Sequence, residues 1–312
     1  MGYSLQTLSG FETFLHNQGF DNPTTNQIAN YLATLGYTSR LAQDIEPGST
    51  PTFNPDAQAD IAVSTNAIFT PTGFATILVD IDDANIVVTG TSSSPVNVAV
   101  ATDSGVSNTV TLNDYGDDQV FLGSGGNNSV TTGHGSDTVV GGVTGNDYVT
   151  VSSYSGSDSI NLSTGSGNDS VLDSGSGKDT IDLGSGFSTV QASSSTGNLD
   201  INTGTGSTSI SLGSSGQDTI NVATNAGAGI PGVTDTITAL GSDTVTFDSS
   251  IALAHEYNIS ATTTVITFGG QLTLDDNNNY VPDPSNPPVQ TVSITTNGGN
   301  VLVEFTDGHF KA

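Results

Sequence analysis

The stretch Thr164-Gly-Ser-Gly-Asn-Asp-Ser-Val-Leu-Asp-Ser-Gly-Ser-Gly-Lys-Asp-Thr-Ile-Asp182 contains two copies of one short pattern. In each copy a glycine (Gly167 or Gly177) is followed two residues later by an aspartate and four residues later by a β-branched residue. The pattern recurs in register between residues 113 and 222, with glycine at positions 116, 126, 135, 145, 156, 167, 177, 186, 197, 206 and 216. A fixed short period of this kind is typical of a solenoid.

Each part of the pattern has a physical role. The β-branched residue favours a very short strand with one side facing inward, and the glycine allows a turn or a close approach of two backbones. We call the position two residues after the glycine the slot. The slot residues are Asp118, Asn128, Asp137, Asp147, Asp158, Asp169, Asp179, Ser188, Leu199, Thr208 and Asp218. Stacked coils would bring the slot carboxylates together, and these would repel one another unless a cation lay between them.

Three copies, at 132–140, 164–172 and 174–182, resemble the calcium-binding nonapeptide G-G-x-G-x-D-x-U-x of RTX (haemolysin-type) proteins. They depart from it in having Ser or Thr in place of the first glycine and a period of about ten residues. The resemblance implies that turn carbonyls and slot aspartates hold Ca²⁺, which takes six to eight oxygen ligands. The residues expected at these sites are Asp118, Asn128, Asp137, Asp147, Asp158, Asp169, Asp179, Asp218 and Asp243, with Gly116, Gly135, Gly145, Gly156, Gly167 and Gly177.

Two turns per coil would place alternate slots on opposite edges. One edge would then be rich in carboxylates, whereas the other would have them only at Asp147 and Asp169, with Asn128 as a carbonyl donor beside them. We therefore expect asymmetric calcium loading. The coils that contain Ser188, Leu199 and Thr208 should stack without an ion.

The composition excludes several classes of protein. There are 38 glycines, 34% hydrophobic residues and a formal net charge of −28, with only three Lys and Arg residues. Nucleic-acid binding requires a basic surface, which is absent here. The absence of cysteine excludes disulfides and thiolate metal sites. No apolar run is long enough for a membrane span, and no cleaved signal peptide is visible at the N-terminus.

Four regions are expected in this mainly β chain. Residues 1–45 show helical spacing of apolar residues and predict a helical module, and 46–112 predict a linker and leading strands. Residues 113–245 predict a right-handed parallel β-roll or β-solenoid, with the full pattern returning at 241–245. Residues 246–312 predict a C-terminal antiparallel β region with a possible export or assembly signal. The helical module is interpreted either as a lid on the first coil or as a docking element. A docking element would bind a neighbouring subunit or the cell surface, where polysaccharide or lipopolysaccharide would be its partner.

The loop between residues 275 and 283 has oxygen-bearing side chains at EF-hand-like spacing. Asp275, Asn277, Asn279 and Asp283 match positions 1, 3, 5 and 9 of such a loop, and the carbonyl of Val281 matches position 7. The glycine and the distal glutamate of an EF-hand are missing. Ordinary loop chemistry and a calcium site therefore both remain open.

No catalytic pattern is found, so we expect no enzyme. His255-Glu256 lacks the second histidine of H-E-x-x-H, and G-x-S-x-G does not occur. RTX-like proteins leave the cell by type I secretion, unfolded at low calcium, and fold in calcium outside. The expected function is a secreted structural protein that self-assembles into a cell-surface layer, a biofilm-matrix sheet or a filament. The strands expected at 289–295 and 301–305 would offer pairing edges between copies. The alternative is an adhesin or a carbohydrate- or ice-binding solenoid.

Overall fold

A computed structural model of the chain provides the coordinates. The structure describes residues 7–17, 20, 22–34, 41–45, 59–63, 66–69, 76–81, 85–89, 96–101, 107–123, 125–152, 154, 156–213, 215–224, 232–248, 254–260, 262–269, 272–274, 280–282, 288, 290–296, 301–305 and 308–311.

Two helices precede a long series of short strands. The helices are α1 (Leu8–Asn17) and α2 (Asn22–Thr34). The strands are β1 (Leu41–Ile45), β2 (Ala59–Val63), β3 (Asn66–Phe69), β4 (Thr76–Ile81), β5 (Asn85–Thr89), β6 (Val96–Ala101), β7 (Thr109–Asn113), β8 (Gln119–Leu122), β9 (Ser129–Thr131), β10 (Thr138–Val140), β11 (Tyr148–Val151), β12 (Ser159–Asn161), β13 (Ser170–Asp173), β14 (Lys178–Asp182), β15 (Ser188–Ala192), β16 (Asn198–Asn202), β17 (Thr208–Leu212), β18 (Thr219–Val222), β19 (Val233–Ala239), β20 (Thr244–Phe247), β21 (Ala254–Ser260), β22 (Thr263–Phe268), β23 (Leu272–Leu274), β24 (Tyr280–Pro282), β25 (Gln290–Thr296), β26 (Leu302–Phe305) and β27 (Gly308–Lys311).

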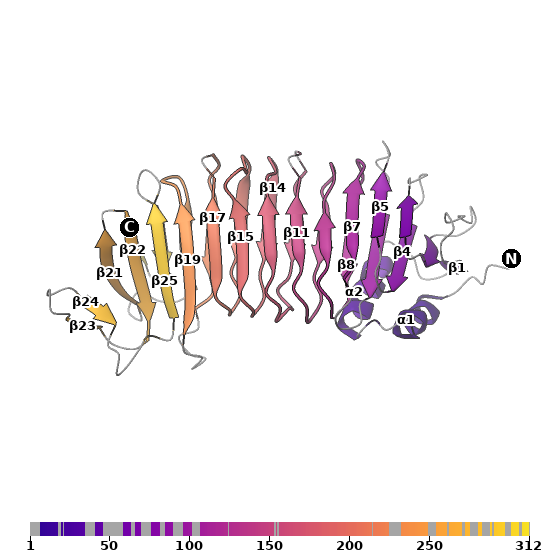
Figure 1. Ribbon diagram of the computed structural model, residues 1–312, viewed down its shortest axis with the longest axis horizontal. Coiled ribbons are helices and arrows are strands. Elements are labelled where there is room, and N and C mark those ends of the chain that lie inside the picture. Colours follow the sequence, from indigo (N-terminus) through magenta and orange to yellow (C-terminus); the bar gives the residue numbers. More distant parts are fainter. Residues whose placement is uncertain are drawn as a thin grey trace.

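Successive strands alternate between two long sheets, which gives the elongated shape in Figure 1. Sheet A has the order β1-β2-β4-β6-β8-β10-β12-β14-β16-β18-β20-β26-β27, and sheet B has the order β21-β22-β25-β19-β17-β15-β13-β11-β9-β7-β5-β3. From β4 to β18 each strand pairs in parallel with the strand two places further along the chain. The prediction of a mainly β chain with a parallel β-solenoid is therefore confirmed.

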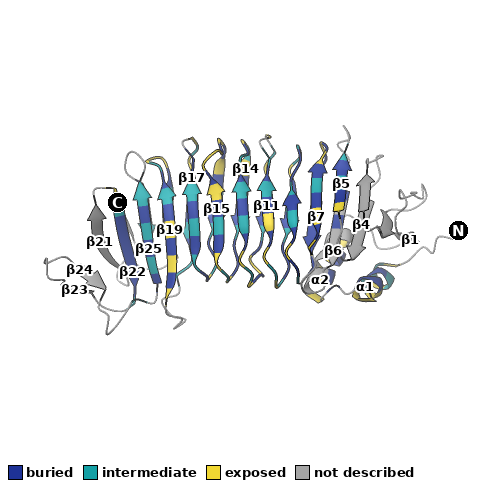
Figure 2. Ribbon diagram, in the orientation of Figure 1, coloured by how far each residue is buried: buried dark blue, intermediate teal, exposed yellow. Residues whose placement is uncertain are grey.

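A thin apolar seam between the sheets forms the core. The β-branched residue of each repeat points inward and stacks on its equivalent in the next coil, as Val139, Ile160 and Ile181 do in sheet A. These three side chains are fully buried. Figure 2 shows the resulting alternation of buried and more exposed residues along the strands. Because burying such a side chain stabilises a fold by about 1.5–3 kcal/mol, the one or two inward apolar residues of each short strand are sufficient only when many coils are stacked.

The repeat glycines are required because successive turns approach closely. A Cβ added to Gly135 would lie 1.6 Å from the carbonyl oxygen of Gly116, and one added to Gly156 would lie 1.6 Å from that of Gly135. Likewise, a Cβ added to Gly167 would lie 1.4 Å from the carbonyl oxygen of Gly145. Any side chain at these positions would push two coils apart. Close approach, rather than a left-handed φ, is thus the reason for glycine at these three positions.

The strands expected before the repeat are present as β4, β5, β6 and β7, and they continue both sheets.

At the C-terminal end, antiparallel pairing is found between β21 and β22, β22 and β25, β23 and β24, and β26 and β27. However, β25 also pairs in parallel with β19, and β26 with β20. The antiparallel region is therefore built onto the ends of the solenoid sheets.

This pairing corrects one prediction. The strands expected at 289–295 and 301–305 are not edges, because β25 lies between β19 and β22 and β26 lies between β20 and β27. The outermost C-terminal strands are β21 in sheet B and β27 in sheet A. The sequence could not reveal this, because the strands that pair in parallel, β19 with β25 and β20 with β26, are more than fifty residues apart in the chain.

The predicted helical module is present as a hairpin. Phe11 and Leu15 of α1 and Ile28 of α2 are buried, and the two helices contact each other. Helix α2 also contacts β8, and Figure 1 shows the hairpin along the lower side of the first coils.

Candidate metal site

The slot residues form two columns, one at each long edge of the solenoid. The first column lies at the N-terminal ends of the strands of sheet A and comprises Asp118, Asp137, Asp158, Asp179, Leu199, Asp218 and Asp243. The second column lies at or near the N-terminal ends of the strands of sheet B and comprises Asn128, Asp147, Asp169, Ser188, Thr208 and Asp235. The predicted separation of alternate slots onto opposite edges is thus confirmed. Asp235 adds a third carboxylate to the second column, so the expectation of carboxylates there only at Asp147 and Asp169 was wrong. Asp235 was not predicted as a site residue, although its position two residues before Ile237 fits the pattern.

Slot side chains connect one coil to the preceding coil. The backbone N–H of Asp118 donates to Oδ1 of Asp137 (2.9 Å), that of Asp137 to Oδ1 of Asp158 (2.8 Å), and that of Asp158 to Oδ1 of Asp179 (2.8 Å). In the second column Asp147 accepts from the N–H of Asn128 at 3.2 Å. These turn N–H groups are buried, so a partner is required. One oxygen of these aspartates is therefore structural, a role that the sequence did not indicate.

Asn128 occupies its slot in the same way as an aspartate. Its Oδ1 accepts from the backbone N–H of Asn108 (3.3 Å), and its Nδ2 donates to Oδ1 of Asp147 (3.0 Å). The amide can therefore donate a hydrogen bond to a neighbouring carboxylate. Two adjacent carboxylates cannot pair with each other unless a proton or a cation lies between them.

The second oxygen distinguishes the aspartates of the first column. Oδ2 of Asp137 accepts from the N–H of Gly133 (2.8 Å), and Oδ2 of Asp158 accepts from Oγ1 of Thr132 (2.9 Å). By contrast, Oδ2 of Asp118 and Oδ2 of Asp179 are buried without a hydrogen-bond partner.

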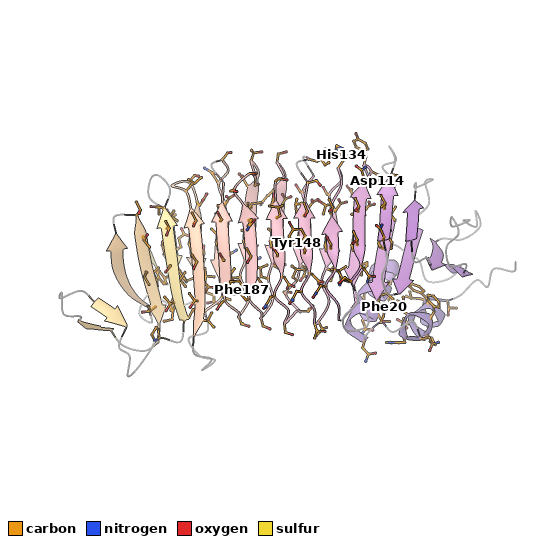
Figure 3. All side chains as sticks on the ribbon, viewed as in Figure 1. Phe20, Asp114, His134, Tyr148 and Phe187 are labelled. Atoms are coloured by element: carbon orange, nitrogen blue, oxygen red, sulfur yellow. The ribbon has the colours of Figure 1, made fainter. Side chains whose placement is uncertain are left out.

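Two further aspartates lie in the same turns as Asp118 and Asp179. Both carboxylate oxygens of Asp114, and Oδ2 of Asp173, are also buried without a partner. Asp114 follows β7, at the upper edge in Figure 3, and Asp173 ends β13. Neither falls on the repeat pattern, and neither was predicted as a site residue.

The pKa values of these carboxyl groups are raised. Burial raises the pKa of Asp118 to about 9, and the adjacent carboxyl group of Asp114 adds to this effect. Burial raises the pKa of Asp179 to about 7, and the negative charge of Asp173 contributes. Lys178, the basic residue beside Asp179, has an exposed side chain. Among the described residues, no basic side chain pairs with the negative charge buried in these turns, and a proton or a cation would stabilise it.

These turns have the donor chemistry that Ca²⁺ prefers. A Cβ added to Gly175 would lie 2.9 Å from Oδ2 of Asp179 and 3.4 Å from Oδ1 of Asp173, so the two carboxylates converge on one small space. In the described part of the chain, no three His, Cys, Asp or Glu side chains gather around one point. A bound calcium would therefore need backbone carbonyls or water in addition to two carboxylates.

The other predicted calcium ligands are placed as follows. Asp147, Asp158 and Asp169 line the turns between coils, and so do Asp218 and Asp243, each buried. The carbonyls of Gly116, Gly135 and Gly145 face the next turn at the close contacts described above, and those of Gly156, Gly167 and Gly177 do the same. Asp275, Asn277, Asn279 and Asp283 lie outside the described residues. Calcium binding by all of these residues stays a prediction.

An aromatic stack runs along the turns of the first column. The His134 ring lies between Tyr115 and Tyr154, with ring centroids 4.2 Å and 3.3 Å apart respectively. The ring faces contact one another, so the stack contributes to cohesion between coils.

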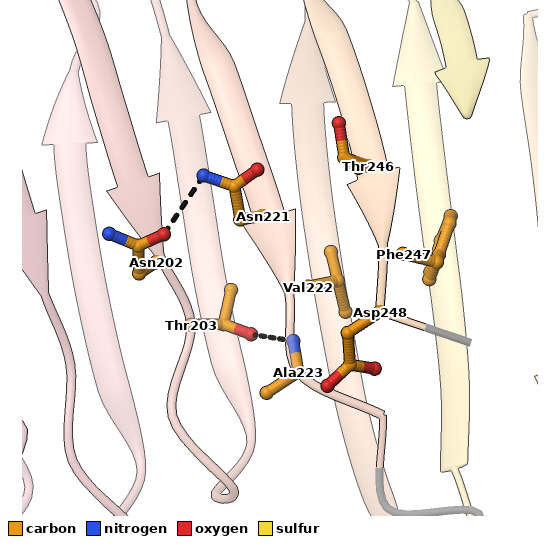
Figure 4. Close-up of a pocket in the computed structure, with 8 residues that line it drawn as sticks. All are labelled: Asn202, Thr203, Asn221, Val222, Ala223, Thr246, Phe247 and Asp248. Carbon is orange, nitrogen blue, oxygen red and sulfur yellow. Dashed lines mark hydrogen bonds between the residues drawn. The ribbon is translucent and has the colours of Figure 1, made fainter. Parts of the chain in front are cut away.

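A shallow groove of about 350 Å³ lies at the ends of β16, β18 and β20 (Figure 4). Most of its polar side chains already bond to one another or to the backbone. Asn221 donates to Oδ1 of Asn202 (2.8 Å), and Thr203 accepts from the N–H of Ala223 (3.0 Å). Asp248 accepts from the N–H of Thr224 at 2.8 Å.

Comparison with known proteins returns no relative. No family model matches the chain, and no curated protein or solved structure matches it significantly. Among the described helices, neither is long and apolar enough to cross a membrane.

Proposed function

We propose that this chain is a secreted, calcium-dependent structural protein that self-assembles at the bacterial cell surface. The observation that carries the proposal is the set of buried carboxylate oxygens without partners at Asp114, Asp118, Asp173 and Asp179. A chain of net charge −28 that buries such groups gains most from a divalent cation, and millimolar calcium is found outside cells. Folding would therefore follow export by a type I route.

The architecture is consistent with a structural role. A continuous buried cluster runs from Ile86 to Phe305, so the described coils share one core. Strands β1 and β3 lie at one end of the two sheets, and β27 and β21 lie at the other. Outermost strands present unpaired N–H and C=O groups that can pair with another copy of the chain. A layer, a matrix sheet or a filament would form in this way, and the α1–α2 hairpin would contact surface polysaccharide or lipopolysaccharide.

The adhesin or ice-binding alternative receives less support. On the outer face of sheet B, Thr111, Thr131 and Thr150 are in register on adjacent strands. Leu172 and Gln191 interrupt this row. A regular binding ladder of one residue type is therefore limited to a few coils.

Electron microscopy of the purified chain tests the proposal. Ordered polymers should form in millimolar calcium, dissolve on addition of a chelator, and be absent when magnesium replaces calcium, because Mg²⁺ requires a tighter octahedral site. Calcium-loaded monomers that do not polymerise at any concentration would contradict it.

A further inference from the structure

Two turns of the first column differ from the turns between them. In the β7–β8 turn, the slot residue Asp118 has Asp114 four residues before it, and in the β13–β14 turn, Asp179 has Asp173 six residues before it. The turns of Asp137 and Asp158 have no such second carboxylate.

The second carboxylate coincides with missing hydrogen bonds. Asp114 and Asp118 are 1% exposed, and Asp173 and Asp179 are fully buried, yet each has at least one oxygen without a partner. Asp137 lies in the same column and is equally buried, but both of its oxygens accept backbone N–H groups. An unpartnered buried carboxylate oxygen is rare in proteins and indicates a missing ligand.

The missing ligand must carry a positive charge, because two buried carboxylates share each of these turns. Oδ1 of Asp173 already accepts from the N–H of Gly175 (2.8 Å), and Oδ1 of Asp179 accepts from that of Asp158. The remaining Oδ2 atoms cannot bond to each other unless a proton or a cation is shared. A Cβ on Gly175 would contact Asp179 at 2.9 Å, so the absence of a side chain there leaves room for a ligand.

We propose that Asp114 with Asp118, and Asp173 with Asp179, form the two tightest divalent-cation sites of the chain. The inference rests on the proposed calcium dependence but differs from the repeat pattern, which would make all slot aspartates equivalent. Each site supplies two carboxylates, which together neutralise one divalent cation. Turns such as that of Asp137 can stack through backbone hydrogen bonds alone.

Counting bound ions tests the inference. The full-length protein is dialysed against calcium buffered at low free concentration, and bound calcium is measured by elemental analysis. Wild type should retain two ions per chain, and Asp114→Asn and Asp173→Asn should retain one each. Asp117→Asn is the matched control, because Asp117 lies in the same turn as Asp118 but is exposed, and it should retain two. Equal counts in wild type and Asp173→Asn would overturn the inference, as would loss of an ion in the control.

A stability measurement keeps the test decisive even if a variant binds poorly for other reasons. In excess chelator, Asp173→Asn should retain more β-sheet by circular dichroism than wild type, because it removes one of two facing charges. In calcium it should gain less stability than wild type. A purely structural Asp173 would instead give destabilisation in both conditions, which would overturn the inference. Gly175→Ala should lose the same ion through steric filling of the space.

The outcome is independent of the assembly experiment. Two tight ions without polymer formation would contradict the proposed function but not the site assignment. Polymers formed by a protein that binds no tight ions at these aspartates would contradict the assignment alone.

Discussion

Replacing Gly167 with alanine should destabilise the solenoid far more than replacing Gly165, two residues earlier in the same turn. Neither glycine has a left-handed φ, so backbone strain is not involved. A Cβ on Gly167 would lie 1.4 Å from the carbonyl oxygen of Gly145, whereas one on Gly165 would lie 3.2 Å from those of Gly142 and Leu162. The two variants therefore differ only in how closely the preceding coil approaches.

The size of the effect follows from the required movement. To reach 3.0 Å, below which real Cβ contacts are essentially not found, the coil of Gly145 would have to retreat by about 1.6 Å, a third of the distance between paired strands. That movement breaks the hydrogen bonds from the N–H of Ser166 to Val143 (3.0 Å) and from the N–H of Asn168 to Asn146 (2.7 Å). At about 0.5–1.5 kcal/mol for each bond, with lost packing in addition, Gly167→Ala should cost about 2–4 kcal/mol.

Gly165→Ala requires a shift of only a few tenths of an ångström. It also restricts the unfolded chain, which stabilises the fold by about 0.4–1 kcal/mol. The variant should therefore remain within about 1 kcal/mol of wild type. Urea denaturation in saturating calcium, followed by circular dichroism, measures both variants. Equal midpoints for the two variants would refute the argument that coil contact is the reason for glycine at position 167.

Three other predictions concern the pH dependence of stability, the apolar core and a hydrogen bond in a turn. The folded-state pKa values of the buried aspartates lie above the unfolded value of 3.8, reaching about 6 at Asp147 and about 9 at Asp118. Because the folded protein holds protons on these carboxyl groups more tightly than the unfolded chain does, the protonated groups stabilise the fold below pH 4, and this stabilisation is lost as the pH rises through 6 to 9. Thermal melts in chelator should therefore show stability falling from pH 4 to pH 9. A rise in stability over this range would contradict the prediction. Ile160→Ala removes a fully buried side chain and should cost about 2–5 kcal/mol in urea denaturation, and a loss below 1 kcal/mol would speak against the seam as the core. Asn146→Ala removes the acceptor for the N–H of Asn168 in an exposed turn, so the same assay should show a loss of about 0.5–1.5 kcal/mol, and no loss would show that water replaces the bond.

The fold was accessible from the sequence because its period is local. A glycine and a β-branched residue four positions apart specify a turn and a short inward-facing strand, and repetition of the unit specifies stacking. The division of slots between two edges follows directly, as the positions of Asp137 and Asp147 show. The path of the chain after Phe247 was not accessible, because β25 pairs with β19 across an intervening segment that contains β20 to β24.

The candidate site was predicted only in part. The slot aspartates were identified, but the sequence does not show that the Oδ1 atom of Asp137 accepts an N–H nineteen residues earlier. Asp114 and Asp173 were missed because they do not fall on the repeat pattern. Their importance lies in the unpartnered oxygens, which only a three-dimensional arrangement reveals.

Small-angle X-ray scattering at neutral pH, with calcium and with excess chelator, tests the central claim most directly. We expect the profile of a stiff rod in calcium and of an expanded chain in chelator, because the buried carboxylates repel one another without cations. The same rod profile in both solutions would contradict it.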